Sequence, residues 1–145
     1  MHQPFDGAKL ALLSGGRILT MLRDDKPDIP FPDMWDLPGG GRDPGESPQD
    51  CVLRETWEEF GLRIAPELLT YRKAHKGTLQ GQGDVWFFAV VLANFDPGLV
   101  RFGDEGQRWE MMDIDTFLNH PRAVRHLQQH LREFLCYDDI ATRPA

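Results

Sequence analysis

The sequence predicts an α/β domain in which a sheet is sandwiched between helices. Three observations support this fold class: a pair of apolar segments near the N-terminus, a well-signalled helix in the middle of the chain, and a long apolar strand after it. A length of 145 residues suits one domain, and the hydrophobic fraction of 41% lies within the ordinary globular range. We therefore expect a single domain over residues 1–145.

The first two predicted strands cover residues 9–14 and 17–22. Both are apolar, and Gly15-Gly16 between them is a natural hairpin turn. The next segment, 24–33, is polar and contains three prolines, so it is predicted to be a loop. We expect this loop to lie over one edge of the functional site.

The central helix is predicted over residues 48–60. Ser47 is a good N-cap, Asp50 three residues later gives a capping-box pattern, Pro48 fits the first helical position and Gly61 supplies the stop. At about 100° per residue, the helix has two unlike faces. The apolar face consists of Val52, Leu53, Thr56, Trp57 and Phe60, and the opposite face of Arg54, Glu55, Glu58 and Glu59.

The second half of the chain alternates further strands and helices. The segment 85–92 is almost continuously apolar, which indicates a strand buried on both faces by helices. The last residues, from about 137, are expected to form a loosely held tail. The other predicted elements are strands at 68–74 and 109–112, a glycine-rich turn at 77–83, and helices at 114–118 and 121–135.

The acidic face of the central helix favours a metal site over simple helix stability. Glu55 and Glu59 are a like-charge pair one turn apart, which costs an isolated helix about 0.2–0.5 kcal/mol. Carboxylates at this spacing converge, and their oxygens are the ligands that hard divalent cations prefer. The alternative is a solvated acidic face in which Glu58 pairs with Arg54.

The residues before the helix decide between these readings. Three glycines, 39–41, precede Glu46 and the helix, so we expect a strand end, a glycine loop, a helix and a second loop. This arrangement resembles the Nudix box, G-x5-E-x7-R-E-U-x-E-E-x-G-U, in which U is a bulky aliphatic residue. The matching residues are Gly40, Glu46, Arg54, Glu55, Glu58, Glu59, Gly61 and Leu62, and the one departure is Thr56 at the first U position.

The resemblance implies the Nudix α/β/α sandwich, a mixed sheet flanked by helices. It also implies hydrolysis of a nucleoside diphosphate linked to another moiety, with Mg²⁺ or Mn²⁺ as cofactor. The implied metal ligands are Glu55, Glu58 and Glu59, of which Glu55 binds metal, acts as general base, or does both. Arg54 is expected to orient Glu55 through an ion pair. The implied loop and structural residues are Gly40, Glu46 and Gly61.

A second acidic segment, 102–107, precedes the last predicted strand. By composition alone it is an ordinary turn. In MutT-like members of the family, however, a glutamate followed by Gly-Gln in this loop approaches the metal cluster. Glu105 matches that position as a further ligand or catalytic base, with Asp104 as the alternative.

Two residues are expected to contact the substrate by the same resemblance. Arg23 aligns with a substrate-facing arginine, although it could also be a surface charge at a strand end. Asn119 aligns with an asparagine that reads the base, and its alternative role is the N-cap of the last helix. Four histidines lack metal-ligand context and are expected at the surface: His75, His120, His126 and His130.

We expect a MutT-like nucleoside triphosphate pyrophosphohydrolase that releases nucleoside monophosphate and pyrophosphate. The alternatives are an ADP-ribose or nucleotide-sugar pyrophosphatase, and a non-catalytic nucleotide-sensing module, although such modules usually lose box glutamates. A net charge of −7 argues against a nucleic-acid polymer as partner, since such binding relies on Lys and Arg. A nucleotide is the expected small-molecule substrate, and a homodimer is compatible with the family.

The sequence also predicts where the protein resides. The N-terminus lacks a signal-peptide pattern, and the longest apolar run, 85–93, is far shorter than the ~20 residues of a membrane span. Two cysteines are too few for a disulfide framework. We expect a cytoplasmic protein that does not associate with membranes.

Overall fold

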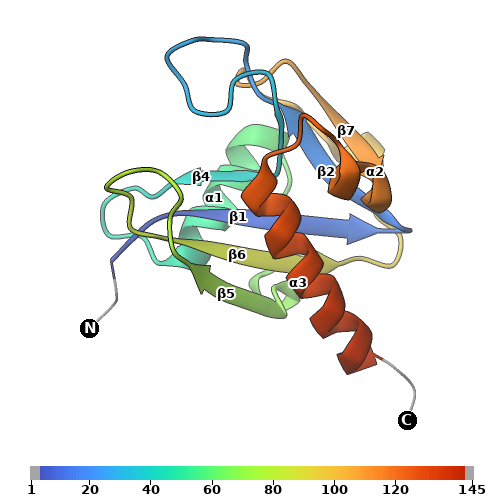
Figure 1. Ribbon diagram of the computed structural model, residues 1–145. Coiled ribbons are helices and arrows are strands. Elements are labelled where there is room, and N and C mark those ends of the chain that lie inside the picture. The colour runs from blue at the N-terminus through green and yellow to red at the C-terminus, as the bar shows by residue number, and fades with distance from the viewer. Residues whose placement is uncertain (1–3, 143–145) are drawn as a thin grey trace.

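In the computed structural model, which describes residues 4–142, one mixed sheet lies between helices on its two faces (Figure 1). The strands are β1 (Phe5–Ser14), β2 (Arg17–Leu22), β3 (Trp35–Asp36), β4 (Gly39–Gly41), β5 (Tyr71–His75), β6 (Asp84–Val91) and β7 (Arg108–Asp113). The helices are α1 (Pro48–Phe60), α2 (Ile114–Asn119) and α3 (Arg125–Thr142), with 3-10 turns at Pro66–Leu68 and Pro97–Leu99.

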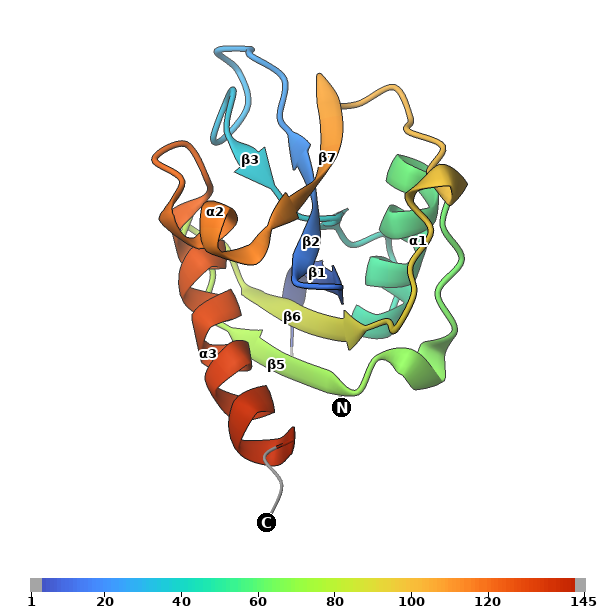
Figure 2. The same cartoon turned by 90° about the vertical axis from the view of Figure 1, so that its right-hand side faces the viewer.

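The sheet has seven strands, with the order β3-β2-β1-β6-β5 along its main path. β1 and β6 are parallel, whereas β1 pairs antiparallel with β2 and with β4, and β2 pairs antiparallel with β7. α1 covers one face, and α2 and α3 cover the other (Figure 2). The predicted α/β sandwich with a mixed sheet is therefore confirmed.

The core is divided by the sheet into two layers. Phe88 and Val90 of β6 pack in the layer beneath α1, while Phe87 and Ala89 pack in the layer beneath α3. All four side chains are buried. This alternation confirms the prediction that the long apolar strand is covered on both faces, because neither face of it reaches solvent there.

The ends of α1 are those predicted, but its buried face is turned. The Ser47 Oγ accepts a hydrogen bond from the Asp50 backbone N–H at 3.1 Å, and Gly61 ends the helix in the left-handed conformation with φ of 66°. Trp57, placed on the predicted apolar face, is 46% exposed, and the Arg63 guanidinium lies 4.3 Å from its ring centre. Glu59, placed on the opposite face, is buried instead.

Two further predictions are wrong in detail. The glycine loop is a strand, β4, because Gly39–Gly41 pairs with β1. The last helix begins at Arg125 and continues to Thr142, through most of the segment expected as a loose tail. The Tyr137 ring packs 5.2 Å from Tyr71 of β5, and this aromatic contact anchors the helix beyond the predicted end. Residues 143–145 of that tail lie outside the described residues.

Within residues 4–142, no helix is both long and apolar enough to cross a bilayer.

The two cysteines should differ sharply in reactivity. Cys51 on α1 is buried, and burial raises the pKa of its thiol to about 12, whereas Cys136 on α3 is exposed. Because the thiolate is the reactive form, native protein treated with iodoacetamide at pH 8 should be alkylated at Cys136 alone. Peptide mass spectrometry checks this, with urea-unfolded protein as the control in which both cysteines react. Rapid alkylation of Cys51 in native protein would contradict the burial of α1 against the sheet.

Candidate active site

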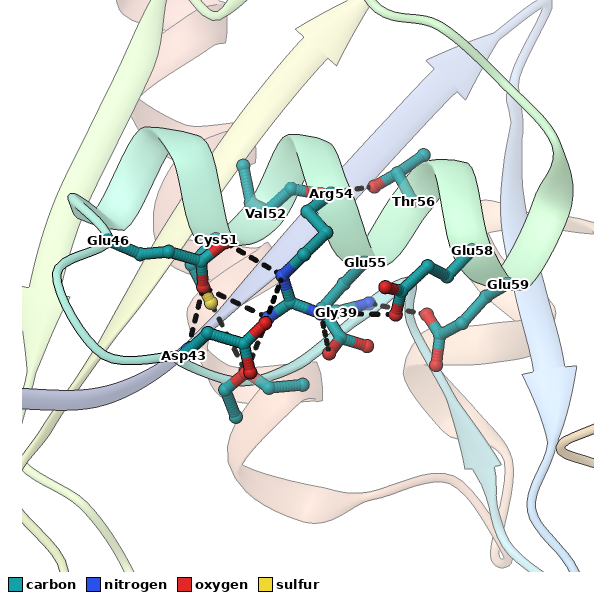
Figure 3. Close-up of polar contacts among 12 residues, drawn as sticks. Gly39, Asp43, Glu46, Cys51, Val52, Arg54, Glu55, Thr56, Glu58 and Glu59 are labelled. Atoms are coloured by element: carbon teal, nitrogen blue, oxygen red, sulfur yellow. Dashed lines mark hydrogen bonds and ion pairs between the residues drawn. The ribbon is translucent and has the colours of Figure 1, made fainter.

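Arg54 on α1 gathers the acidic residues of the box around one guanidinium group. Its Nε donates to Glu46 Oε2 at 2.7 Å, and its Nη1 donates to Glu55 Oε1 at 2.8 Å and Glu58 Oε2 at 3.1 Å (Figure 3). Its Nη2 donates to the Gly41 carbonyl at 2.9 Å. The hydrogen bonds from Arg54 hold the pKa of Glu46 below its ordinary value. Arg54 thus ties the helix, the preceding loop and β4 together.

Glu55 lies directly against the backbone of β4. A Cβ atom built on Gly40 would lie 2.7 Å from the Glu55 Oε2, so any larger residue would require this carboxylate to move. Burial raises the pKa of Glu55, and its hydrogen bond from Arg54 opposes that rise. The close approach explains why the box places a glycine ahead of the helix that carries the glutamates.

Glu59 is held by the next residue of the same strand. The Gly39 backbone N–H donates to Glu59 Oε1 at 2.8 Å, and the residue is only 8% exposed. Burial raises the pKa of the carboxyl to about 8, with the positive charge of Lys9 acting in the opposite direction. This hydrogen bond satisfies one oxygen of a carboxylate that would otherwise be costly to bury, which accounts for the turned face of α1.

These carboxylates open into a cavity of about 660 Å³ beside α1. The loop 101–107 forms its opposite wall, because the Gly103 N–H donates to the Glu59 carbonyl at 2.9 Å and the Gln107 N–H to the Leu22 carbonyl at 2.8 Å. Glu105 is brought to the cavity in this way. The acidic residues that line it are Asp24, Glu55, Glu58, Glu59, Asp104 and Glu105.

The donor set of this cavity fits a hard divalent cation. Six acidic residues line it, and carboxylate oxygens suit Mg²⁺ and Mn²⁺; Met21 adds a thioether sulfur, which such hard cations do not prefer. Among the side chains of residues 4–137, no three acidic, histidine or cysteine groups already form a ready metal site. Glu55 and Glu58 accept hydrogen bonds from Arg54, and Glu59 accepts one from the Gly39 N–H. To bind a cation, these carboxylates would reorient from those hydrogen bonds.

A cationic pair borders the acidic cavity. Lys9 Nζ of β1 lies 2.9 Å from Asp36 Oδ2, and Arg23 Nη1 lies 2.8 Å from the same oxygen. Burial opposes ionisation of Asp36, but the charges of Lys9 and Arg23 outweigh it and hold its pKa below the ordinary value. Both cations also line a second cavity of about 240 Å³. Arg23 therefore lines both cavities, and its contact with the substrate stays a prediction.

Sequence reasoning missed Lys9 and two histidines. Lys9 is the one charged residue within residues 8–13, the apolar run of β1, which was an available signal. His126 and His130 of α3, expected at the surface, line the second cavity because α3 packs across the sheet beside it. No local pattern indicates this placement.

Asn119 is positioned differently from the prediction. It is the last residue of α2, and its Nδ2 donates to the Asp115 carbonyl at 2.9 Å. It does not cap the last helix, because α3 begins only at Arg125. Nor is it among the described residues that line the two cavities. The structure therefore does not bring Asn119 to the site.

The fold and this site define a Nudix hydrolase. The sequence model of the NUDIX domain matches residues 6–134, and the chain belongs to that family. An RNA pyrophosphohydrolase of Rhodospirillum rubrum is 33% identical over 118 residues, which cover 71% of this chain and 68% of that protein. The protein is accordingly an enzyme of the pyrophosphohydrolase class that acts on nucleoside diphosphate derivatives.

Solved structures show the same fold. A MutT protein of Methanosarcina mazei Go1 superposes with a TM-score of 0.69 at 19% identity, over 99% of both chains. A bifunctional NMN adenylyltransferase/ADP ribose pyrophosphatase of Francisella tularensis, complexed with AMP and a Mn ion, gives a TM-score of 0.72 at 19% identity, covering 92% of this chain and 42% of that one. Nudix enzymes generally use divalent metals.

Replacing Glu59 with glutamine should stabilise the metal-free protein. A carboxyl whose pKa is raised to about 8 destabilises the folded state once ionised; this penalty is absent below its ordinary pKa and complete above about 8. At pH 9 in EDTA, Glu59→Gln should raise Tm by roughly 3–8 °C, because the amide oxygen still accepts from Gly39 without a buried charge. Thermal unfolding checks this.

The matched control for that measurement is Glu67→Gln on the exposed 3-10 turn, which should leave Tm unchanged. A lower Tm for Glu59→Gln than for the parent protein would show that the negative charge stabilises the fold.

Proposed function

We propose that the protein is a MutT-like nucleoside triphosphate pyrophosphohydrolase that releases nucleoside monophosphate and pyrophosphate with Mg²⁺ or Mn²⁺. The observation that carries this proposal is the pair of adjoining cavities. The larger has the carboxylates to hold divalent ions and the room for a polyphosphate, and the smaller continues from it past Lys9 and Arg23. One nucleotide fits this pair of cavities, with its phosphates in the larger one beside α1 and its nucleoside in the smaller one.

In this proposal Glu55, Glu58 and Glu59 hold the metal, which when bound offsets phosphate charge and lowers the pKa of a coordinated water. Arg54 orients Glu55 and Glu58 through its hydrogen bonds. Lys9 and Arg23 face the phosphates where the two cavities meet.

We assign the general base to Glu105. It is exposed at the cavity wall facing α1, and it has no hydrogen-bond or ion-pair partner among residues 4–137, whereas Glu55 is engaged by Arg54. A group that is free and open to water can accept the proton of the attacking water. The oxygen of that water forms the new bond to phosphorus as the bond between monophosphate and pyrophosphate breaks.

A second candidate substrate is an RNA carrying a 5′ triphosphate. The observation that favours it is the name of the Rhodospirillum rubrum relative, an RNA pyrophosphohydrolase. Such an RNA presents the same triphosphate group as a free nucleotide. The absence of a nucleic-acid partner, a cytoplasmic location and a homodimer remain predictions from the sequence.

A hydrolysis screen separates these substrates. Purified protein is incubated in Mg²⁺, in Mn²⁺ and in EDTA with nucleoside triphosphates (oxidised purines included), 5′-triphosphorylated RNA, ADP-ribose and nucleotide sugars. We expect pyrophosphate and monophosphate from free triphosphates, and no product in EDTA. Turnover of RNA alone would select the second candidate, and turnover of only the linked diphosphates would overturn the triphosphate proposal.

Replacing Glu58 should abolish this turnover without harming the fold. The Glu58 side chain is 55% exposed, so Glu58→Gln removes a ligand charge at little cost in stability. We expect the Mg²⁺-dependent rate to fall by about 100-fold or more. Glu67→Gln, an exposed glutamate outside both cavities, is the matched control and should keep the parent rate. Full activity of Glu58→Gln would refute its assignment as a ligand.

A further inference from the structure

The smaller cavity brings together segments that are far apart in the sequence. Phe31 comes from the proline-rich loop after β2, His126 and His130 come from α3, and Leu79 comes from the loop between β5 and β6. Lys9 and Arg23 stand where this cavity meets the acidic one. The rest of its lining combines apolar residues with charged and polar side chains such as Asp6, Lys76 and Gln82. In a concave small-molecule site, polar groups of this kind orient the ligand.

The loop that presents Phe31 has a strained backbone. Phe31 and Asp33 adopt φ of 52° and 56°, in the left-handed region that non-glycine residues seldom occupy. Strain of this kind persists only where surrounding contacts impose it, and it gathers at functional sites.

Asp33 supplies those contacts. Arg122 Nη2 donates to Asp33 Oδ2 at 2.7 Å, and Gln107 Nε2 donates to Asp33 Oδ1 at 2.8 Å. The Arg23 Nε also donates to the Pro30 carbonyl at 2.9 Å. The fold thus fixes the ring of Phe31 at the cavity from both sides of the loop.

The wall beside Phe31 offers hydrogen-bonding groups. The His126 ring lies 5.5 Å from the Phe31 ring and 5.7 Å from the His130 ring, which stacks on His75 at 3.5 Å. Burial lowers the pKa of His126 and brings that of His130 to about 4. Both imidazoles are therefore neutral at pH 7, and each presents one donor and one acceptor.

We propose that Phe31, His126 and His130 select the nucleobase of the substrate, with the base against the Phe31 ring and its polar edge toward the two histidines. This inference rests on the proposed function, because it places the triphosphate in the acidic cavity and the nucleoside in the smaller one. The cavity volume of about 240 Å³ is below the ~300–1,000 Å³ of sites for drug-sized ligands. It suits a single base, and the second nucleoside of a dinucleotide would lie outside.

The test compares a substrate with a base and one without. Phe31→Ala should raise KM for a nucleoside triphosphate about fivefold to a hundredfold, the range that stacking on one aromatic ring supplies. It should leave hydrolysis of ribose 5-triphosphate, which lacks a base, unchanged. Phe31→Tyr retains the ring and should retain the parent KM. Leu99→Ala, which removes an exposed apolar side chain outside both cavities, is the matched control.

Binding of a nucleoside monophosphate provides a second readout that is independent of turnover. The imidazole NMR signals of His126 and His130 should shift on titration, while those of His120, which does not line the cavity, should not. Equal KM for Phe31→Ala and the parent, or unshifted histidine signals under saturating nucleotide, would overturn the base subsite. Absence of hydrolysis of every triphosphate, including ribose 5-triphosphate, would instead refute the proposed function.

Discussion

The site depends on one cation placed among carboxylates that would otherwise repel each other. Exposed ion pairs contribute about 0–1 kcal/mol each, but Arg54 is a different case, since its side chain is only 22% exposed and several acceptors share it. The entropy cost of ordering one guanidinium is therefore spent once, while the ion pairs to Glu46, Glu55 and Glu58 are all formed. Without this cation, α1 would carry a run of like charges facing β4, and the helix could not pack so closely on the strand.

Close packing of α1 on β4 brings the box carboxylates together and also lowers the stability of the folded protein. The apolar side of α1, with Val52 and Phe60, is buried in the core and fixes the helix against the sheet. That anchoring carries Glu59 into a nearly dry position where the charge of Lys9 and the Gly39 N–H offset only part of the cost of its own charge. A divalent ion bound to the folded protein alone would stabilise it by mass action. The apparent stability of the enzyme would then depend on the concentration of that ion.

The sequence predicts those parts of the molecule that local chemistry determines. Ser47 and Gly61 set the ends of α1, and the spacing of the box glutamates places them on one side of that helix. Local sequence does not determine how α1 is rotated about its axis. Glu59 rather than Trp57 lies on the buried side, and there it accepts a hydrogen bond from β4, a separate strand. The length of α3 depends in the same way on Tyr71, a residue from another strand. His126 becomes part of a cavity only because α3 crosses the sheet, which no motif records.

The charge distribution favours a free nucleotide over an RNA chain as substrate. Lys9 and Arg23 are the cations best placed for phosphates, yet both are already engaged by Asp36. The acidic cavity would repel a triphosphate unless divalent ions accompany it, so affinity is concentrated where those ions bind. Phosphates further along an RNA would lie beyond that point, on a protein of net charge −7. Since nucleic-acid binding relies on Lys and Arg to displace counterions, an extended RNA gains little from this surface beyond its first nucleotide.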